Sequence, residues 1–267
     1  MTYFTIFLIF ISGLSIGSFL NCLIRRLHKK DTILGRSYCP VCRHQLAWYD
    51  NLPIASFLFL KGKCRYCSKK ISWQYPSVEL ITGLLFVLSY YINFKDISII
   101  NYPLSVMQMI RDWFLICVMM IIFIYDMRWY LILDVVTLPS ALIILVLNLV
   151  IDAVRTGGIG LWQNILFSGI IGGGFFLFQF TVSKGRWIGG GDIRLGLLMG
   201  LALGWPNILV AIFLAYIIGS IIGVGLIAGG KKQWGSQIPF GIFLSSATII
   251  SLFWGGAILD WYLSILY

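Results

Sequence analysis

The sequence has few charged residues. Asp, Glu, Lys and Arg make up 11% of its 267 residues, about half the share in an ordinary soluble domain, whereas 59% are hydrophobic. So few charges argue against a water-soluble protein of this length and predict a chain that lies mostly in lipid. The net charge of +10 would suit a nucleic acid, but no RNA- or DNA-binding motif accompanies it, and an anionic membrane surface explains it more simply.

The charge-free stretches of the chain mark its predicted membrane helices. A helix needs roughly 20 residues to cross the hydrocarbon core. The longest stretch, 195–230, is too long for one crossing, and the turn-forming run Gly204-Trp-Pro-Asn207 divides it. The sequence therefore predicts an all-α polytopic membrane protein with about eight transmembrane helices. The stretches cover residues 3–24, 80–94, 113–125, 135–151, 156–183, 195–230 and 233–259.

Two of these predicted helices are short. Stretch 113–125 gives about 20 Å of helix against a hydrocarbon core of about 30 Å, and the stretch 195–204 is shorter still. For the first, we expect either that Arg111 and Asp112 reach outward or that Asp126 lies below the membrane surface.

The basic residues predict the orientation in the membrane. The first stretch has no basic residue before it and Arg25, Arg26, Lys29 and Lys30 after it, the reverse of a cleavable signal peptide. We therefore expect a permanent anchor with its N-terminus outside. Threading eight helices from that start places 17 of the 20 Lys and Arg residues on one side, which the positive-inside rule assigns to the cytosol. Both termini would then lie outside. The predicted domains are a first helix (1–24), a cytosolic segment (25–77) and a membrane domain (78–267).

Four cysteines form two pairs in the cytosolic segment, Cys39-Pro-Val-Cys42 and Cys64-Arg-Tyr-Cys67. Two such pairs on tight turns can place four thiolates around one zinc ion. A segment this small hardly builds a core of its own, so a structural zinc would supply folding energy. The alternatives are two disulfides, which a cytosolic location opposes, and a redox-active pair, which usually needs only one motif.

The nearby histidine, the other two cysteines and the basic residues around the pairs have simpler interpretations. With four thiols available, His44 is not expected to be a ligand. Cys22 and Cys117 lie in apolar helices and are expected to be core residues. The basic residues around the pairs are expected to form a solvated face beside anionic headgroups. They are Arg43, Lys61, Lys63, Arg65, Lys69 and Lys70.

Carboxylates at membrane depth are costly and point to function. Asp192 follows Gly189, Gly190 and Gly191, which let another group approach closely. Glycines then recur every four residues, at 196, 200 and 204, so a neighbouring helix can pack very near Asp192. The alternative is a helix-entry turn in which Asp192 caps the helix or pairs with Arg194.

Asp192 needs a second carboxylate for acid-base chemistry, and the spacing leaves two choices open. Asp126 and Asp134 both lie on the cytosolic side of the predicted topology, but about 12 Å apart if the chain between them is helical. Two carboxyl groups held close in a partly dry site do not both ionise easily, and together they can activate water for attack on an amide. Glu79 can act as a first-turn dipole partner of its helix, and Asp152 and Asp260 are expected at a solvated outer boundary.

In order along the chain, these motifs resemble the type IV prepilin leader peptidases, which are polytopic aspartic proteases of the GxGD class. Gly13-Leu-Ser-Ile-Gly17-Ser-Phe-Leu-Asn21 is similar to the N-terminal signature of the family, and the four cysteines to its cytosolic domain. Tyr75-Pro-Ser-Val-Glu79 continues the match, Gly189-Gly-Gly-Asp192 resembles the GxGD element, and Ile238-Pro-Phe-Gly241 resembles the motif before the last helix.

The resemblance implies that Asp126 and Asp192 are catalytic, with Asp126 chosen over Asp134. Support of the active site or substrate is expected from Gly189, Gly190, Gly191, Glu79 and Arg194. Two residues depart from the family pattern, because Leu133 replaces a usual proline and Arg194 a usual lysine. Neither departure removes a catalytic group, so only the local geometry differs.

The implied activity is removal of a short basic leader from prepilins and pseudopilins, just after a glycine, at the cytosolic face of a prokaryotic cytoplasmic membrane. Many members of the family then methylate the new N-terminus with S-adenosylmethionine, although no nucleotide-binding glycine motif is present here. Prepilins, pseudopilins and membrane lipid are the expected partners, and no nucleic acid. The alternatives are a non-enzymatic scaffold or transporter with a zinc-bound docking module, and a methyltransferase without protease activity.

Overall fold

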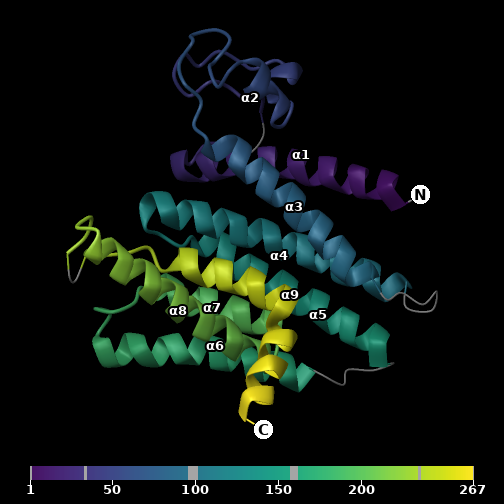
Figure 1. Cartoon of the computed structure of the whole chain (residues 1–267), viewed down its shortest axis with the longest axis vertical. Helices are drawn as coiled ribbons and strands as arrows, with labels where there is room; N and C mark the ends of the chain where they lie inside the picture. Colours follow the sequence, from purple (N-terminus) through teal and green to yellow (C-terminus); the bar gives the residue numbers. More distant parts are fainter. Residues whose placement is uncertain (1, 33–34, 96–101, 157–161, 234–235, 267) are drawn as a thin grey trace. The chain divides into compact units, whose positions relative to one another are not determined.

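The computed structural model describes residues 2–32, 35–95, 102–156, 162–233 and 236–266 (Figure 1). Within these ranges the chain is almost entirely helical, with two isolated β-bridges and no strands, so the predicted all-α fold is confirmed. The elements are α1 (Thr2–Lys29), the 3-10 helix η1 (Trp48–Asn51), α2 (Ala55–Phe59), α3 (Gln74–Phe94), α4 (Tyr102–Trp129), α5 (Asp134–Thr156), α6 (Trp162–Ser183), α7 (Gly190–Leu203), α8 (Asn207–Ala228) and α9 (Gly241–Leu266).

Seven helices among the described residues are long and apolar enough to cross a membrane, namely α1, α3, α4, α5, α6, α8 and α9. The eighth predicted helix is α7, which has 14 residues and is as short as the sequence indicates. The predicted turn at 204–207 is confirmed, because α7 ends at Leu203 and α8 begins at Asn207. Gly204 closes α7 with a positive φ of 69°, a backbone conformation that side chains disfavour. The protein is therefore a multi-pass membrane protein.

The expectation of a short helix over 113–125 is wrong. The helix α4 has 28 residues and continues through Arg111 and Asp112, which are not turned outward. Arg111 donates to Asp112 at 2.6 Å, and the side chain of Asp112 is only 5% exposed. The pair neutralises its own charge inside the helix bundle, so a charge-free stretch underestimates the length of this helix.

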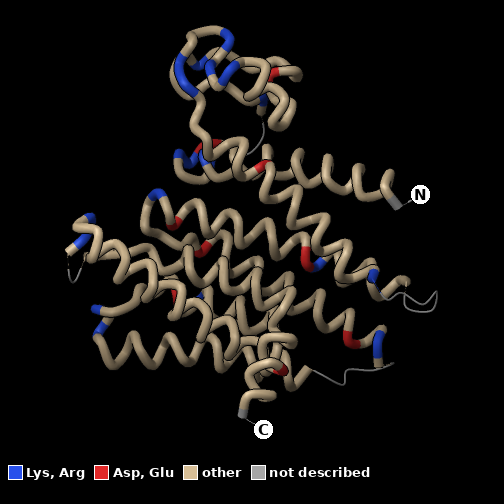
Figure 2. The backbone as a smooth tube through the Cα atoms, viewed as in Figure 1, with Lys and Arg blue, Asp and Glu red and all other residues tan. Residues whose placement is uncertain are grey.

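The chain divides into two compact units, Met1–Ile92 and Asn93–Tyr267. The first unit holds α1, the four-cysteine module and most of α3, and the second holds α4 to α9. The finer division into 1–24, 25–77 and 78–267 stays a prediction. Figure 2 shows that charged residues are sparse along the helices and that Lys and Arg gather on the cysteine module and near helix ends.

Within the first unit, α1 and α3 approach each other at glycines. A Cβ added to Gly13 would lie 2.7 Å from the Cα of Gly83, and one added to Gly17 would lie 2.7 Å from the Cα of Glu79. Any side chain at these positions would push the backbones apart. Small residues therefore set the distance between the two helices, as is common between membrane helices.

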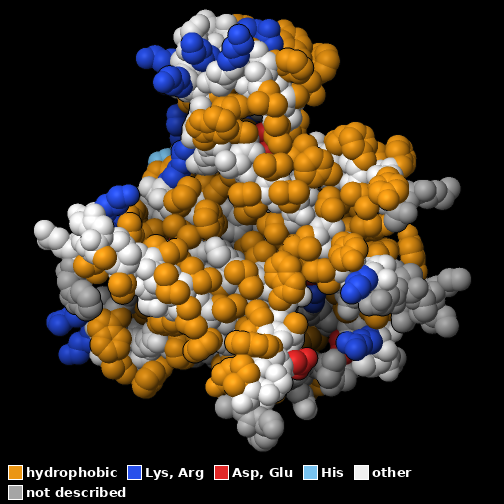
Figure 3. Space-filling model, in the orientation of Figure 1, with side chains coloured by type: hydrophobic (Ala, Val, Ile, Leu, Met, Phe, Trp, Pro, Cys, Tyr) orange, Lys and Arg blue, Asp and Glu red, His pale blue; other side chains and the backbone are white. Residues whose placement is uncertain are grey.

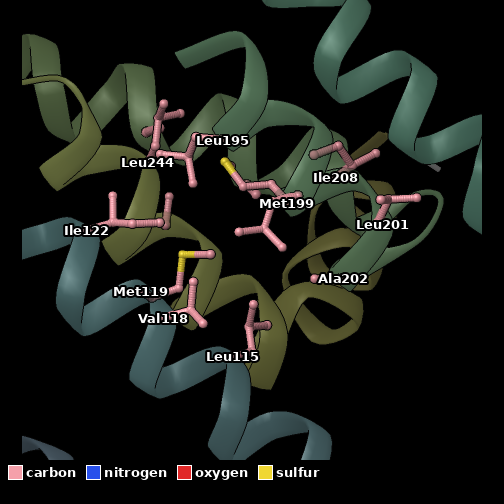
Figure 4. Close-up of a cluster of buried hydrophobic side chains, with 14 of the residues drawn as sticks. Leu115, Val118, Met119, Ile122, Leu195, Met199, Leu201, Ala202, Ile208 and Leu244 are labelled. Carbon is pink, nitrogen blue, oxygen red and sulfur yellow. The ribbon is translucent and has the colours of Figure 1, made fainter. Parts of the chain in front are cut away.

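The core of the second unit surrounds α7. This helix contacts α5, α6, α8 and α9, and its residues Leu195, Leu198 and Met199 are fully buried. Figure 4 shows α7 side chains meeting Met119 and Ile122 of α4 and further residues from α8 and α9. Because α7 is enclosed by its neighbours, the position of its first turn is fixed from several sides.

The glycine stripe on α7 packs against α6, so the expected close neighbour of this helix is confirmed. A Cβ added to Gly196 or Gly200 would collide with backbone atoms of α6. The hydroxyl of Ser168 donates to the carbonyl oxygen of Gly200 at 2.5 Å and ties the two helices together.

Candidate active site and metal centre

Asp126 lies in the last turn of α4 and is only 4% exposed. The first turn of α9 covers it, because a Cβ added to Gly241 would lie 2.8 Å from Asp126 Oδ2. The backbone amides of Gly241 and Ile242 face the carboxyl group. These amides have no partner inside their own helix, so they favour a negative charge at Asp126. Within the part of the chain that the structure describes, Oδ2 is buried and has no hydrogen-bond partner.

Asp192 lies in the first turn of α7 and is 6% exposed. Its Oδ2 accepts a hydrogen bond of 2.9 Å from the amide of Gly189, while its own amide donates to the carbonyl oxygen of Gly189 at 3.1 Å. The capping role that the sequence left open is therefore present. The same contact fixes the orientation of the carboxyl group and leaves its other oxygen, Oδ1, for a further contact.

Both aspartates belong to one site. Their carboxyl groups are close enough to interact electrostatically. Ile132, in the loop between α4 and α5, lies between the two glycines that flank them: a Cβ added to Gly191 would be 2.8 Å from its Cβ, and one added to Gly241 would be 3.1 Å from its Cδ1. Two buried carboxyl groups thus converge where the end of α4 meets the beginnings of α7 and α9.

Asp134 has a different environment. It begins α5, its side chain is 49% exposed, and it forms an ion pair with Arg194 of α7. Arg194 therefore pairs with Asp134 and not with Asp192. Of the two carboxylates that the spacing left open as partners of Asp192, the geometry favours Asp126.

Three other acidic residues that the sequence singled out are not part of the Asp126–Asp192 pair. Glu79 belongs to the first unit, where its Oε2 accepts a hydrogen bond of 2.8 Å from the amide of Ile54 and so attaches the cysteine module to α3. Asp260 is exposed as expected, but the expectation of a solvated Asp152 is wrong, because this residue is 4% exposed. It lies near the C-terminal end of α5 and is buried there.

The sequence analysis missed three residues of the site. Gly241 and Ile132 have the close contacts described above. Tyr216 of α8 interacts electrostatically with Asp192 and donates a hydrogen bond of 2.6 Å to Gln179 Oε1 of α6. Gly241 ends a recognised motif, and its place directly before the last helix was the available signal. Ile132 and Tyr216 stand in apolar surroundings and carry no such signal.

The four-cysteine module contains two turns of the same design. In each turn, the amide of the first cysteine donates to the carbonyl oxygen five residues later, Cys39 to His44 at 2.9 Å and Cys64 to Lys69 at 2.8 Å. A residue with positive φ, Arg43 or Ser68, follows in each turn. The repetition brings both cysteine pairs to one point.

The sulfur atoms of Cys39, Cys42, Cys64 and Cys67 all lie within 4.8 Å of one another, and those of Cys39 and Cys67 are 3.9 Å apart. Tetrahedral zinc with Zn–S bonds of about 2.3 Å requires sulfur separations of about 3.8 Å. All four cysteines are free thiols. Burial raises the pKa of Cys39, but the amides of Cys42 and Val41 outweigh it and lower this pKa to about 7. The donor set therefore fits a thiolate-bound metal ion.

The residues around this cluster hold the two turns together. Asp50 of η1 accepts hydrogen bonds from Arg65 Nε at 2.8 Å and from the Tyr66 hydroxyl at 3.2 Å, both in the second turn. His44 stacks on the ring of Tyr66. His44 thus contacts an aromatic ring and lies outside the thiol cluster, as the sequence indicated. Cys22 and Cys117 also lie outside it.

Two family descriptions match the chain. Residues 11–93 match the "Bacterial Peptidase A24 N-terminal domain", and residues 113–224 match the "Type IV leader peptidase family". The second match contains Asp126, Asp192 and the glycines before Asp192.

Curated relatives extend over nearly the whole chain. A protein named prepilin leader peptidase/N-methyltransferase from Aeromonas salmonicida is 31% identical over 96% of this chain and 93% of its own length. A protein of the same name from Bacillus subtilis is 30% identical over 96% of this chain and 97% of its own length. No solved structure matches the chain. The lengths covered and the two family matches agree that the chain belongs to the type IV leader peptidase family.

Proposed function

We propose that this protein is a membrane aspartic endopeptidase that removes the basic leader peptide from type IV prepilins and pseudopilins. The observation that carries the proposal is the convergence of Asp126 and Asp192, both buried and both beside the N-terminus of a helix. The names of the relatives supply the substrate class. The family's motifs occur in this chain in the family's order, which argues against a scaffold or transporter.

In the proposed mechanism, one carboxyl group is ionised and the other keeps a proton. The carboxylate takes a proton from a water molecule, whose oxygen attacks the carbonyl carbon of the scissile amide, while the protonated carboxyl group donates to the carbonyl oxygen. Collapse of the tetrahedral intermediate breaks the C–N bond, and the leaving amine takes a proton from the site. Gly241 and Ile242 orient Asp126, and Gly189 orients Asp192. Ile132 fills the space beside both.

The proposed orientation places the cysteine module and both aspartates on the cytosolic side of a prokaryotic cytoplasmic membrane, with both termini outside. The support is the distribution of the Lys and Arg residues along the chain, 17 of 20 on one side. In this orientation the scissile bond lies where the substrate's apolar helix leaves the cytosolic face. Arg194 and Glu79 would act as supports, through Asp134 and the cysteine module respectively.

Two cofactors belong to the proposal. We assign the thiol cluster to a structural zinc ion, held by Cys39, Cys42, Cys64 and Cys67, because four thiolates at these separations suit this metal. We also propose methylation of the new N-terminus with S-adenosylmethionine as the methyl donor, on the strength of the relatives' names.

The test compares three isosteric variants of the purified full-length protein on a prepilin substrate. Asp126→Asn and Asp192→Asn are each expected to abolish cleavage. Asp134→Asn is the matched control, because this residue is half exposed and pairs with Arg194 outside the catalytic pair, and it should retain cleavage. Full cleavage by either of the first two variants would refute the assignment.

Mass measurement of the products, with and without S-adenosylmethionine, reports both activities. Cleavage after a glycine and a mass increase of one methyl group only with the donor are expected. Cleavage without methylation would overturn the second activity alone. Methylation of pre-cleaved substrate by a protein that never cleaves would support the methyltransferase alternative.

A further inference from the structure

We infer that the short helix α2 of the cysteine module is embedded in the lipid interface of the membrane that α1 and α3 cross. The inference rests on the first unit alone and does not depend on the proposed peptidase activity.

Large apolar side chains are exposed around α2. Phe59 is 85% exposed, Leu58 is 65% exposed and Trp73 is 73% exposed. Trp73 packs against Phe57 of α2, with ring centroids 4.9 Å apart, so it lies beside this helix. We call the three exposed residues Leu58, Phe59 and Trp73 the α2 patch. Water-facing surfaces of small modules seldom carry such a cluster.

The attachment points of the module give its depth. Ile54, which directly precedes α2, is bonded to Glu79, and Glu79 packs on α1 at Gly17. The beginning of the module is attached at a different level, because Arg25 donates to the carbonyl oxygen of Tyr38 at 3.2 Å. Gly17 precedes Arg25 by eight residues, which is about 12 Å along a helix.

This difference in level places α2 at the membrane. Arg25 begins the basic end of α1, which belongs at the level of the headgroups. The interfacial layer on each side of the hydrocarbon core is only about 5–7 Å thick. A segment attached about 12 Å further inward therefore starts beside the lipid-facing part of the helix pair, and the α2 patch meets lipid there.

Charge supports lipid as the partner. Lys61 and Lys63 follow α2 directly and are both exposed. Lysine ammonium groups beside inserted apolar residues reach the phosphates of anionic lipids, and tryptophan favours the same layer. Figure 3 shows Lys and Arg side chains of the module close to hydrophobic side chains in this view. The module thus combines an apolar edge with basic residues, as interfacial segments do.

The experiment measures the depth of position 59 in full-length protein reconstituted in phosphatidylglycerol-containing nanodiscs. A spin label attached to a genetically encoded keto amino acid at Phe59 leaves all cysteines unchanged. A second label at Leu58 repeats the measurement. The control label replaces Val41, which is 58% exposed and lies in the first cysteine turn.

Power saturation then compares the accessibility of each label to oxygen, which enriches in lipid, and to a water-soluble nickel complex. The oxygen-to-nickel ratio is expected to be several-fold higher at positions 58 and 59 than at 41. Equal ratios at all three positions would overturn the inference, because they indicate water. Protection from both reagents would also overturn it, because it indicates a protein contact.

The two lysines are tested in the same assay. Replacing them with glutamine (Lys61→Gln and Lys63→Gln together) should lower the ratio at position 59 in phosphatidylglycerol discs. An unchanged ratio would overturn the role assigned to the two lysines. Thermal unfolding and metal content verify that each labelled protein is folded.

Discussion

Replacing Gly191 with alanine would place a methyl group against the loop between α4 and α5. The added Cβ would lie 2.8 Å from Ile132 Cβ and 3.5 Å from two further atoms of the same side chain. The adjacent position offers a matched control, because a Cβ at Gly190 would meet nothing within 4 Å. Both glycines are in the first turn of the helix that carries Asp192, so the two variants differ only in what the methyl group touches.

The expected magnitude follows from the contact. Restoring an ordinary separation requires a movement of about half an ångström or more, and such overpacking costs about 1–3 kcal/mol. The movement displaces either Asp192 or the loop that also packs on Gly241, and a misplacement of 1 Å can reduce catalysis about 100-fold. We expect Gly191→Ala to lower kcat/KM by about 10- to 100-fold. Gly190→Ala should stay within about twofold of the unchanged protein and stabilise α7 by up to about 1 kcal/mol.

The assay is the initial rate of prepilin cleavage by purified full-length protein, followed by mass spectrometry, with thermal unfolding measured in parallel. Full activity of Gly191→Ala would refute the reasoning, because it would mean that Ile132 does not constrain Asp192. Equal losses in both variants would refute it too, because the methyl group at position 190 has no contact to disturb.

Three further predictions concern stability and metal binding. Asn148→Ala should lower the free energy of unfolding by about 1–3 kcal/mol, because Asn148 donates to the buried Leu201 carbonyl at 2.7 Å; denaturant titration in detergent measures it. Burial raises the pKa of Asp50, but its hydrogen bonds outweigh burial and hold this pKa below the usual value. The stability that Asp50 contributes should therefore be complete above about pH 4 and lost as the pH falls through its lowered value, as pH-dependent unfolding of wild type and Asp50→Asn would report. Finally, we expect elemental analysis to find zinc in the unchanged protein and in Cys117→Ser, but not in Cys64→Ser, because Cys64 belongs to the thiol cluster and Cys117 does not.

Each of these has a contrary result. An unchanged midpoint of denaturant unfolding for Asn148→Ala would mean that a water molecule replaces the lost hydrogen bond to the Leu201 carbonyl. If the free energy of unfolding changed with pH in the same way for wild type and Asp50→Asn, the fold would not favour the ionised form of Asp50. Zinc retained by the Cys64→Ser variant at full stoichiometry would contradict a site closed by four thiolates.

Much of the fold follows from where charges are missing, since lipid penalises each unpaired charge strongly. That rule fails for α4, because Arg111 and Asp112 neutralise each other inside the helix, and a pair costs far less than two separate charges. It fails again for Asp152, which is buried although the local pattern suggests a solvated boundary. The first case depends on two adjacent residues of one helix, and the second depends on burial that the local pattern does not show.

The sequence predicts some residues of the candidate site but not others. Asp192 has a local signature, because the glycines before it serve the turn itself. The choice of Asp126 over Asp134 depends on which of the two meets the first turn of α9, and their eight-residue separation in the sequence does not determine that. Tyr216 and Ile132 enter the site only through helix packing, so no spacing rule could have selected them.

The position of Gly241 has a consequence for the order of events during synthesis. The first turn of α9 is the last part of the site to be made, and it supplies the amides that face Asp126. The short helix α7 and its glycine-packed neighbour α6 both precede α9 in the chain. A growing chain therefore carries both aspartates before it has the turn that orients one of them. If both aspartates are catalytic, as we propose, we expect proteolytic activity to begin only when the final helix has entered the membrane.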